Sequence, residues 1–478
     1  MTPSLVSDGT SPREDGRTSI RRHLRTVTSR LGEESGFRSV VHSHRDVKLL
    51  FLQRFIRMFA YGGTTLVLAA YLAALGISES RIGLFMTLTL LGDIFIGLVL
   101  TLRADRIGRR LILAIGAILV TCSGLAFALS NSYWVLLAAA VFGVISPNGN
   151  EIGPFRAIEE SIIAQLTDND SLGSIYAWYA LTGQAGLAMG MIVCGWVANS
   201  LRENGRDFIF ASRILFLIYA TAGAIKLLIN LFLTTAVEAE AKQPAVHESQ
   251  ETQPLLREVQ DDEAQTTTVD RVKPMPSSGH GELRWLVICL TLFFTLDNFG
   301  SGVMNLTWMT YFFRQKYGLQ DGALGSVFFT TGIIAALSSL VAASIARRFG
   351  NVKTMVFTHL PSSTFLACIP FSPNLTVALF FVIARSCTQM MDVGPRTAFL
   401  ATVLPTDKRT AIMGFLNTVK ICSTTVGPLL TGGLAEANLF WVAFVVAGSC
   451  KVVYDLGILF TFVGYEKRHE TRRSQSAE

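Results

Sequence analysis

The sequence predicts an all-α polytopic membrane protein, with twelve transmembrane helices in two six-helix bundles related by pseudo-symmetry. Half of the 478 residues are hydrophobic and only 16% are charged, which makes the chain far more apolar than a soluble domain. Apolar runs long enough to cross a bilayer occur six times before and six times after a polar stretch at 236–282. Matching residues recur about 240 positions apart in the two halves, as expected for a chain built from two parallel repeats.

The apolar runs and the polar segments around them divide the chain into five parts. A tail at 1–47 is rich in Arg and Ser, and a linker at 236–282 is rich in Glu, Gln, Thr and Pro, so both are expected to be disordered. The N-terminal bundle takes up 48–235, and the C-terminal bundle takes up 283–465, followed by a tail at 466–478. The expected crossings are 50–75, 81–102, 111–130, 134–164, 173–198 and 209–235, and then 284–313, 323–346, 352–371, 376–404, 411–435 and 439–464.

Basic residues in the short loops indicate the orientation of the chain. Four arginines lie within the eight residues 103–110, and positive charge in short loops favours the cytoplasmic side. The same rule places Arg347, Arg348 and both termini on that side. The first 47 residues have no apolar core or cleavage site, so they are not expected to be a secretory signal.

The linker contains a candidate sorting signal. Glu251, Leu255 and Leu256 form a pattern like an acidic dileucine motif, which a sorting adaptor would bind. This pattern favours a vacuolar or lysosomal membrane, and the plasma membrane stays open as an alternative.

Composition and motifs exclude several classes of function. All seven cysteines fall inside apolar runs without paired or CxxC spacing, so no disulfide framework, metal site or cofactor is expected. The basic residues lie in tails and short loops rather than on one face of a soluble domain, so nucleic acid is not an expected partner. No Gly-x-x-x-x-Gly-Lys-Ser/Thr stretch occurs, which argues against a pump driven by ATP and against an enzyme of that class.

Repeated motifs support the two halves residue by residue. Gly76 and Gly83 match Gly318 and Gly325, and the segment 104–108 matches 346–350. The segment 151–156, Glu-Ile-Gly-Pro-Phe-Arg, matches 392–396, Asp-Val-Gly-Pro-Arg, and 222–226 matches 447–451.

The loop at 101–110 reads Thr-Leu-Arg-Ala-Asp-Arg-Ile-Gly-Arg-Arg. It resembles the loop between helices 2 and 3 of the major facilitator superfamily, whose pattern is Gly-x-Leu-Ala-Asp-Arg-x-Gly-Arg-Arg. Thr101 and Arg103 depart from that pattern. The resemblance extends over 48–465 and implies a secondary transporter that binds a small molecule between two bundles and works by alternating access. The six matching positions are Ala104, Asp105, Arg106, Gly108, Arg109 and Arg110.

The resemblance also implies a gate formed by this loop and by two charges nearby. The Asp105 carboxylate is expected to accept hydrogen bonds at the start of helix 11, around Arg409–Ile412, only when the cytoplasmic side is closed. Asp93 on helix 2 and Lys420 on helix 11 each lie about ten residues from the cytoplasmic end of their helix. We expect a state-dependent ion pair between them, with Asp93 bound inside its own half as the alternative. Arg106, Gly108, Arg109 and Arg110 belong to the same expected gate.

Ionisable side chains at membrane depth mark the candidate site, because each costs about 2.5–3.5 kcal/mol to insert and needs a partner, water or a route to the interface. Arg57 on helix 1 and Asp297 on helix 7 are equivalent in the repeat, and by resemblance these helices line the central cavity. We expect them to meet across it as the substrate and coupling site, unless Arg57 pairs locally. Lys451 and Asp455, four residues apart, are expected to pair with each other. Lys226 is expected to extend toward the inner end of helix 6.

Helices 4 and 10 supply the remaining candidates. Glu151 and Arg156 on helix 4, and Asp392 and Arg396 on helix 10, each lie beside a Gly-Pro pair that permits a kink. Asp392 and Arg396 can also pair within their own helix. Further candidates are Arg385 and Gln389, which match the Arg-x-x-x-Gln element of proton-coupled members although those carry it in helix 4, together with Gln184, Asn148, Asn305 and Trp308.

Three hypotheses of function follow. The first is proton-coupled movement of a small organic solute, with Asp297, Glu151 or Asp392 as the titrating acid. The second is a facilitator without ion coupling, and the third is a receptor or scaffold that resembles a transporter. Transport measured with and without a pH gradient separates the three.

Overall fold

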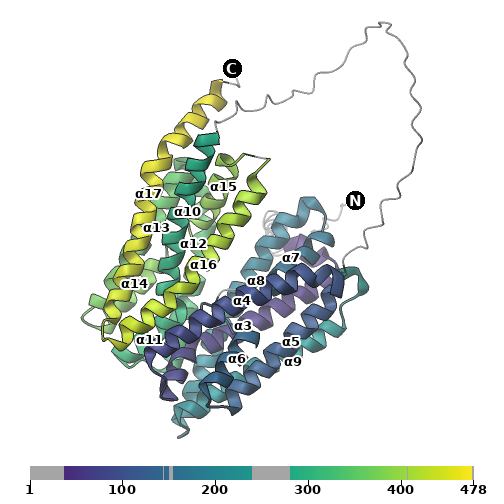
Figure 1. Ribbon diagram of the computed structural model, residues 1–478, viewed down its shortest axis with the longest axis vertical. Coiled ribbons are helices and arrows are strands. Elements are labelled where there is room, and N and C mark those ends of the chain that lie inside the picture. Colours follow the sequence, from purple (N-terminus) through teal and green to yellow (C-terminus); the bar gives the residue numbers. More distant parts are fainter. Residues whose placement is uncertain (1–36, 144, 150–153, 239–279, 406, 476–478) are drawn as a thin grey trace, which may run out of the picture.

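The computed structural model describes residues 37–143, 145–149, 154–238, 280–405 and 407–475. Within these ranges every regular element is a helix, and the helices form two bundles (Figure 1). The N-terminal bundle contains α3 (Arg45–Ala74), α4 (Glu79–Ile107), α5 (Arg109–Leu129), α6 (Tyr133–Gly143), α7 (Pro154–Gln165), α8 (Asn169–Glu203) and α9 (Phe208–Leu231). The C-terminal bundle contains α10 (His280–Val303), α11 (Leu306–Tyr317), α12 (Asp321–Phe349), α13 (Asn351–Cys368), α14 (Leu375–Ser386), α15 (Val393–Val403), α16 (Arg409–Glu436) and α17 (Phe440–Gln475).

Each of the twelve predicted crossings corresponds to one helix or to two consecutive helices. Crossings 4, 7 and 10 are the interrupted ones, made of α6 and α7, of α10 and α11, and of α14 and α15. The interruptions in crossings 4 and 10 come just before the two predicted Gly-Pro pairs. Pro154 is the first residue of α7 and Pro395 the third of α15, and in the first turn of a helix a proline leaves no intrahelical hydrogen bond unmade.

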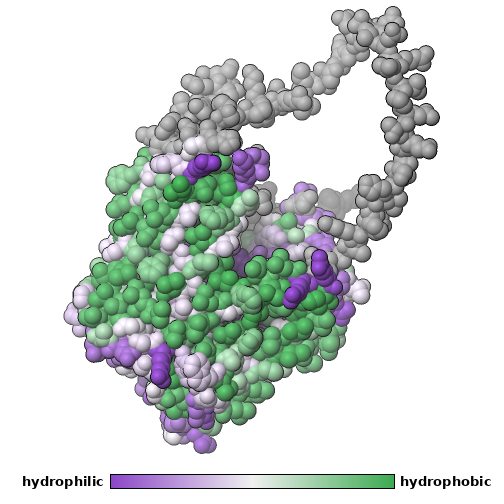
Figure 2. Space-filling view, in the orientation of Figure 1, coloured by the Kyte–Doolittle hydropathy of each residue, from purple (hydrophilic) through white to green (hydrophobic). Residues whose placement is uncertain are grey.

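The outer surface of the bundles is that of a membrane protein. In the described part of the chain, eight helices are long and apolar enough to cross a bilayer. Large apolar side chains point outward, with Phe95, Leu129 and Phe460 being 69%, 78% and 81% exposed. Figure 2 shows these hydrophobic surfaces along the sides of both bundles, with hydrophilic patches toward their ends.

Two helix–helix contacts through small residues, which we call the glycine crossings, join the bundles at the end opposite to the chain termini. We call this end the closed end. α4 crosses α16 where Gly83 faces Pro428 and Gly432, and α12 crosses α8 where Gly325 faces Met191. A Cβ atom on Gly83 would lie 2.6 Å from the carbonyl oxygen of Pro428, which is closer than atoms pack. Glycine is therefore required for the backbones to approach this far.

Polar contacts reinforce the closed end. The Tyr311 hydroxyl donates to Glu79 Oε1 at 2.9 Å, and the Ser80 amide donates to Glu436 Oε2 at 3.0 Å. The Trp196 indole donates to Ser326 at 3.0 Å. From this end the two bundles diverge toward the termini (Figure 1).

Matching turns show the internal repeat in the backbone. Gly76 and Gly318 end the first crossing of each half with φ of 81° and 65°, and Gly108 and Gly350 end the second with φ of 104° and 85°. Positive φ favours glycine because it has no Cβ. The residues paired in the sequence therefore have the same backbone role.

Helices continue into three segments that the sequence predicts as tails or linker. α2 (Phe37–His42) precedes α3, η1 (Thr235–Val237) follows α9, and α17 runs to Gln475. The start of the linker is held because Thr234 donates to Asp46 through its hydroxyl and its amide. The candidate sorting residues Glu251, Leu255 and Leu256 lie outside the described residues.

Candidate functional site

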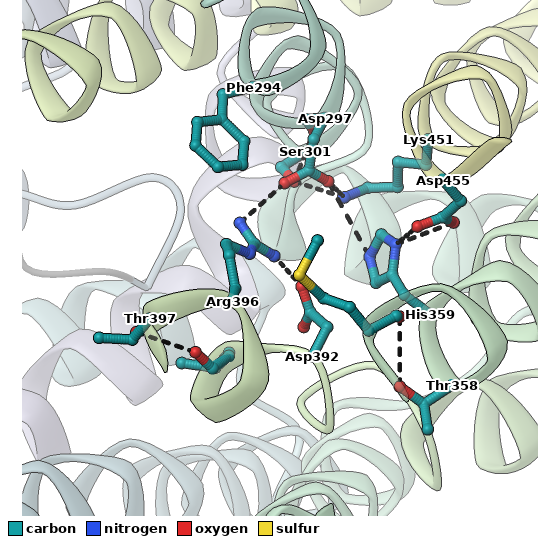
Figure 3. Close-up of polar contacts among 12 residues, drawn as sticks. Phe294, Asp297, Ser301, Thr358, His359, Asp392, Arg396, Thr397, Lys451 and Asp455 are labelled. Atoms are coloured by element: carbon teal, nitrogen blue, oxygen red, sulfur yellow. Dashed lines mark hydrogen bonds and ion pairs between the residues drawn. The ribbon is translucent and has the colours of Figure 1, made fainter. Parts of the chain in front are cut away.

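Asp297 on α10 lies at the centre of a buried charge network in the C-terminal bundle (Figure 3). Lys451 Nζ on α17 donates to its Oδ1 at 2.7 Å, and Arg396 Nη1 on α15 donates to its Oδ2 at 3.2 Å. Lys451 also donates to Ser301 at 2.7 Å. Asp297 is only 4% exposed, so its charge is balanced by these cations rather than by water.

His359 on α13 connects this network to a second carboxylate. Its Nδ1 lies 2.9 Å and 3.0 Å from the two carboxylate oxygens of Asp455, and its Nε2 lies 3.9 Å from Asp297 Oδ1. The Ser363 hydroxyl donates to Asp455 at 3.2 Å. The prediction that Lys451 and Asp455 pair with each other is wrong, because each has a nearer partner on another helix.

Arg396 and Lys420 complete the network. Arg396 forms the predicted ion pair with Asp392, four residues earlier at the start of α15. The Lys420 ammonium lies 4.3 Å from the centre of the Phe294 ring, and the Arg396 guanidinium lies 5.8 Å from the same ring. Three carboxylates thus lie among two ammonium groups and one guanidinium.

The N-terminal bundle has its own buried ion pair. Arg57 on α3 donates to Glu159 on α7 through two nitrogens, at 2.6 Å and 2.7 Å. The Tyr179 hydroxyl also donates to Glu159. Arg57 is 1% exposed and Glu159 is fully buried, so this bidentate pair lies in the core of its bundle.

The predicted contact between Arg57 and Asp297 is therefore wrong. Each charge has a hydrogen-bonded partner of opposite sign on a neighbouring helix of its own bundle. The two pairs nevertheless occupy matching helices with opposite polarity. Helix 1 supplies the base and helix 4 the acid in the first half, whereas helix 7 supplies the acid and helix 10 the base in the second.

Two further charged side chains also lie inside the N-terminal bundle. The prediction for Lys226 is wrong, because it does not extend to a helix end: it is 1% exposed, and its ammonium lies 4.0 Å from the centre of the Phe155 ring. Asp93 is 1% exposed and makes no ion pair with Lys420 in this structure, so the state-dependent pair between them stays a prediction. Neither carboxylate oxygen of Asp93 has a hydrogen-bond partner among the described residues.

The loop between α4 and α5 is bound by the start of the linker. Glu238 accepts hydrogen bonds from the backbone amides of Arg109 at 2.6 Å and Arg110 at 3.2 Å. The Gln165 amide donates to the carbonyl oxygens of Ala236 and Glu238. A carboxylate at this helix start satisfies free amides and the helix dipole. No sequence pattern indicates that a linker residue would supply it.

The other predicted gate residues are placed only in part. Arg106 is exposed on the surface of α4. The side chain of Asp105 lies outside the described residues, so its contact with the start of α16 stays a prediction.

The remaining candidates lie at different places in the structure. Arg156 pairs with Glu160 at 2.7 Å on the surface, where it is 49% exposed, so it does not belong to the buried network. Glu151 lies outside the described residues. Arg385 lies in the last turn of α14 and Gln389 in the turn after it, both partly buried, whereas Gln184 is exposed.

Polar groups without partners gather near the interruptions of crossings 4 and 7. Both amide atoms of Asn148 and the Nδ2 of Asn305 are buried and have no hydrogen-bond partner in the described part of the chain. Asn305 Oδ1 caps α11 by accepting from the Trp308 amide at 2.9 Å. The Trp308 ring itself is packed against Tyr311 and Phe440 in the closed end.

Comparison with known proteins agrees with this architecture. Residues 50–391 and 290–478 match the Major Facilitator Superfamily. An uncharacterised membrane protein of Saccharomyces cerevisiae, YJR124C, is 34% identical over 438 residues, which cover 89% of this chain and 95% of the yeast protein. The quinolone resistance protein NorA of Staphylococcus aureus is 24% identical over 156 residues, covering 33% of this chain and 39% of NorA.

Solved structures show the same fold at low identity. The nucleoside transporter NupG superposes with a TM-score of 0.64 at 13% identity, covering 88% of this chain and 100% of NupG. A D-xylose-proton symporter superposes with a TM-score of 0.64 at 16% identity, covering 87% of this chain and 97% of the symporter. The chain is an integral multi-pass membrane protein that belongs to the Major Facilitator Superfamily of membrane transporters.

Proposed function

We propose that this protein is a secondary active transporter that moves a small organic solute by alternating access and couples the movement to protons. The observation that carries the proposal is the position of Asp297, a buried carboxylate held by Lys451 and Arg396 from two other helices. A carboxylate that exchanges cationic partners when helices move can couple that movement to protonation. The pair of Arg57 and Glu159 is held in addition by Tyr179 and serves as a fixed structural pair.

The solute binds between the bundles, next to the interrupted helices. Thr307 at the start of α11 donates to the Pro147 carbonyl oxygen at 2.5 Å, which brings the interruptions of crossings 4 and 7 together. Asn148 and Asn305 beside this contact hold buried amide groups without partners. Buried polar groups need hydrogen-bond partners, so a solute with hydroxyl or carbonyl groups fits this position.

The proposed orientation of the chain in the membrane rests on the positive charge of its loops. Positive charge in the loops puts both termini in the cytoplasm, so the structure with its closed end opposite to the termini is an inward-facing state. In the outward-facing state the glycine crossings would separate and the loop around Asp105 would contact the start of α16.

Uptake into proteoliposomes, with and without a pH gradient, tests the proposal against a panel of metabolites and drugs. Each pH unit supplies about 1.4 kcal/mol per proton, enough for roughly tenfold accumulation. Asp297→Asn is expected to abolish this accumulation while leaving solute exchange across the membrane at least partly intact. Arg156→Gln is the matched control, because it removes a surface pair outside the network and should keep wild-type coupling.

Accumulation by Asp297→Asn at the wild-type level would remove Asp297 from the mechanism. If the wild type takes up a solute equally well with and without the pH gradient, the protein would be an uncoupled facilitator. Failure to move any solute of the panel would favour a receptor or scaffold.

A further inference from the structure

The two ring nitrogens of His359 face two different carboxylates of the network. Nδ1 is within hydrogen-bond distance of both Asp455 oxygens, at 2.9 Å and 3.0 Å, while Nε2 lies 3.9 Å from Asp297 Oδ1. His359 is 4% exposed and Asp455 is 1% exposed. Figure 3 shows the imidazole between these two acids, with Lys451 beside it.

The partners fix the tautomer of the neutral ring. An ionised carboxylate only accepts hydrogen bonds, so Nδ1 carries the proton and donates it to Asp455. Nε2 then presents a lone pair toward Asp297 Oδ1, and 3.9 Å is too long for a hydrogen bond. This leaves one basic nitrogen next to an acid that Lys451 and Arg396 already neutralise.

Charged groups surround His359 from each helix that faces it. α17 presents Lys451, Asp455 and the ring of Tyr454, whose centroid is 5.8 Å from the imidazole. α10 presents Asp297, and Arg396 of α15 lies on the far side of that carboxylate. α12 and α14 also pack on α13, but the charged side chains of their described residues make no ion pair with His359.

We infer that His359 Nε2 binds the coupling proton, and that Asp297 stays ionised and receives the new N–H. The inference rests on the proposed function and assigns its proton site. Asp297 accepts from a cation on each oxygen, so a proton there would remove the negative charge that holds both cations, whereas Nε2 has a free lone pair. The three carboxylates Asp297, Asp392 and Asp455 balance Arg396, Lys420 and Lys451, so a proton on His359 leaves one excess positive charge.

This excess charge supplies the coupling. A proton from the open end adds to the Nε2 lone pair, no other bond breaks, and the new Nε2–H donates to Asp297 Oδ1. That oxygen also accepts from Lys451, so two positive charges then lie beside one oxygen, and their repulsion drives Lys451 away from the imidazolium. Since Lys451 lies on α17 and Asp297 on α10, protonation weakens the contact between these two helices.

Nitrogen NMR of the full-length protein in lipid nanodiscs, with [15N]histidine, tests the site without any solute. When the pH of the sample is lowered, the Nε2 signal of His359 is expected to change from the lone-pair form to the protonated form while Nδ1 stays protonated. His359→Gln assigns the signal by removing it. Asp455→Asn assigns it independently, because loss of the carboxylate charge should disturb this histidine and leave exposed His42 unchanged.

A pH-sensitive dye gives a second readout. Over the same change of pH His359→Gln should bind about one proton fewer per protein than the wild type, and it should lose pH-driven accumulation of any solute that the panel identifies. The inference is overturned if Nε2 stays unprotonated throughout, if Nδ1 is the nitrogen that changes, or if His359→Gln accumulates solute like the wild type. If no solute of the panel is transported, the proposed function is contradicted. The NMR titration would still decide whether His359 binds the proton.

Discussion

Replacing Gly432 by alanine is expected to open the closed end. A Cβ at this position would lie 2.8 Å from the Cα of Gly83 and 3.0 Å from its nitrogen, and closer still to the carbonyl oxygen of Glu79. Ordinary contact begins at 3.4 Å, so α4 and α16 must separate by at least 3.4 − 2.8 = 0.6 Å at the Gly83 Cα. All three obstructing atoms belong to the backbone, so no side chain can rotate away.

The size of the effect follows from the cost of such a clash. Overpacking costs about 1–3 kcal/mol, and 1.4 kcal/mol corresponds to a factor of ten in an equilibrium. The clash exists only while α4 and α16 are in contact. Gly432→Ala should therefore shift the equilibrium by about 5-fold to about 150-fold toward the state in which these helices are separated.

Gly433→Ala is the matched control. A Cβ on Gly433 would meet no atom within 4 Å, and both substitutions change helix propensity by the same amount of about 1 kcal/mol. The assay is the distance between spin labels at Ser132 and Ala437, which are both exposed near the closed end, in a chain whose seven native cysteines have been replaced.

A longer distance in Gly432→Ala and an unchanged one in Gly433→Ala are expected. The argument would be refuted by equal distances in Gly432→Ala and the parent, or by an equal shift in the two alanine variants.

Three further predictions concern buried or capping acids. Asp93→Asn should leave the thermal stability unchanged or raised, because neither carboxylate oxygen has a hydrogen-bond partner in the described chain; a large loss would show that a charged Asp93 is needed. Glu159→Gln should cost about 3–5 kcal/mol of stability by leaving Arg57 without its bidentate partner, and adding Arg57→Met should recover part of this loss; a double variant no more stable than Glu159→Gln alone would contradict the pair. Glu238→Gln should weaken the start of α5 by about 1 kcal/mol, seen as faster amide exchange in its first turn, and an unchanged exchange rate would show that the Glu238 contact to Arg109 has no effect there.

The sequence predicts the helices because their signals are local. Runs of about 20 apolar residues, and glycines at turns such as Gly76, Gly108, Gly318 and Gly350, determine where a crossing begins and ends. Pro154 and Pro395 each lie in the first turn of the helix that follows an interruption, a position that suits proline, although Pro361 and Pro428 lie inside α13 and α16. The interruption after Val303 carries no such marker, and it was found only in the structure.

The partners of the buried charges were harder to predict. Spacing along a helix identifies Asp392 and Arg396, four residues apart, and the structure forms that pair. The same rule fails for Lys451, whose partner Asp297 is 154 residues away. Which of several cations reaches a given acid depends on how helices pack, and hydropathy contains no information about that rotation. A lone histidine inside the apolar run of helix 9 was the available signal for His359.

Amide hydrogens in the middle of helix 10 should exchange more readily than those of a continuous membrane helix. In the turn between α14 and α15, two backbone hydrogen bonds join residues three positions apart. The Thr388 amide donates to the Arg385 carbonyl oxygen, and the Met391 amide donates to the Thr388 carbonyl oxygen, both at 3.1 Å. Its side chains also reach the surface, with Met390 being 39% exposed. Deuterium should therefore enter this turn sooner than α14 or α15 on either side. The exchange rate of this turn would report how far water penetrates between the bundles, without an attached probe.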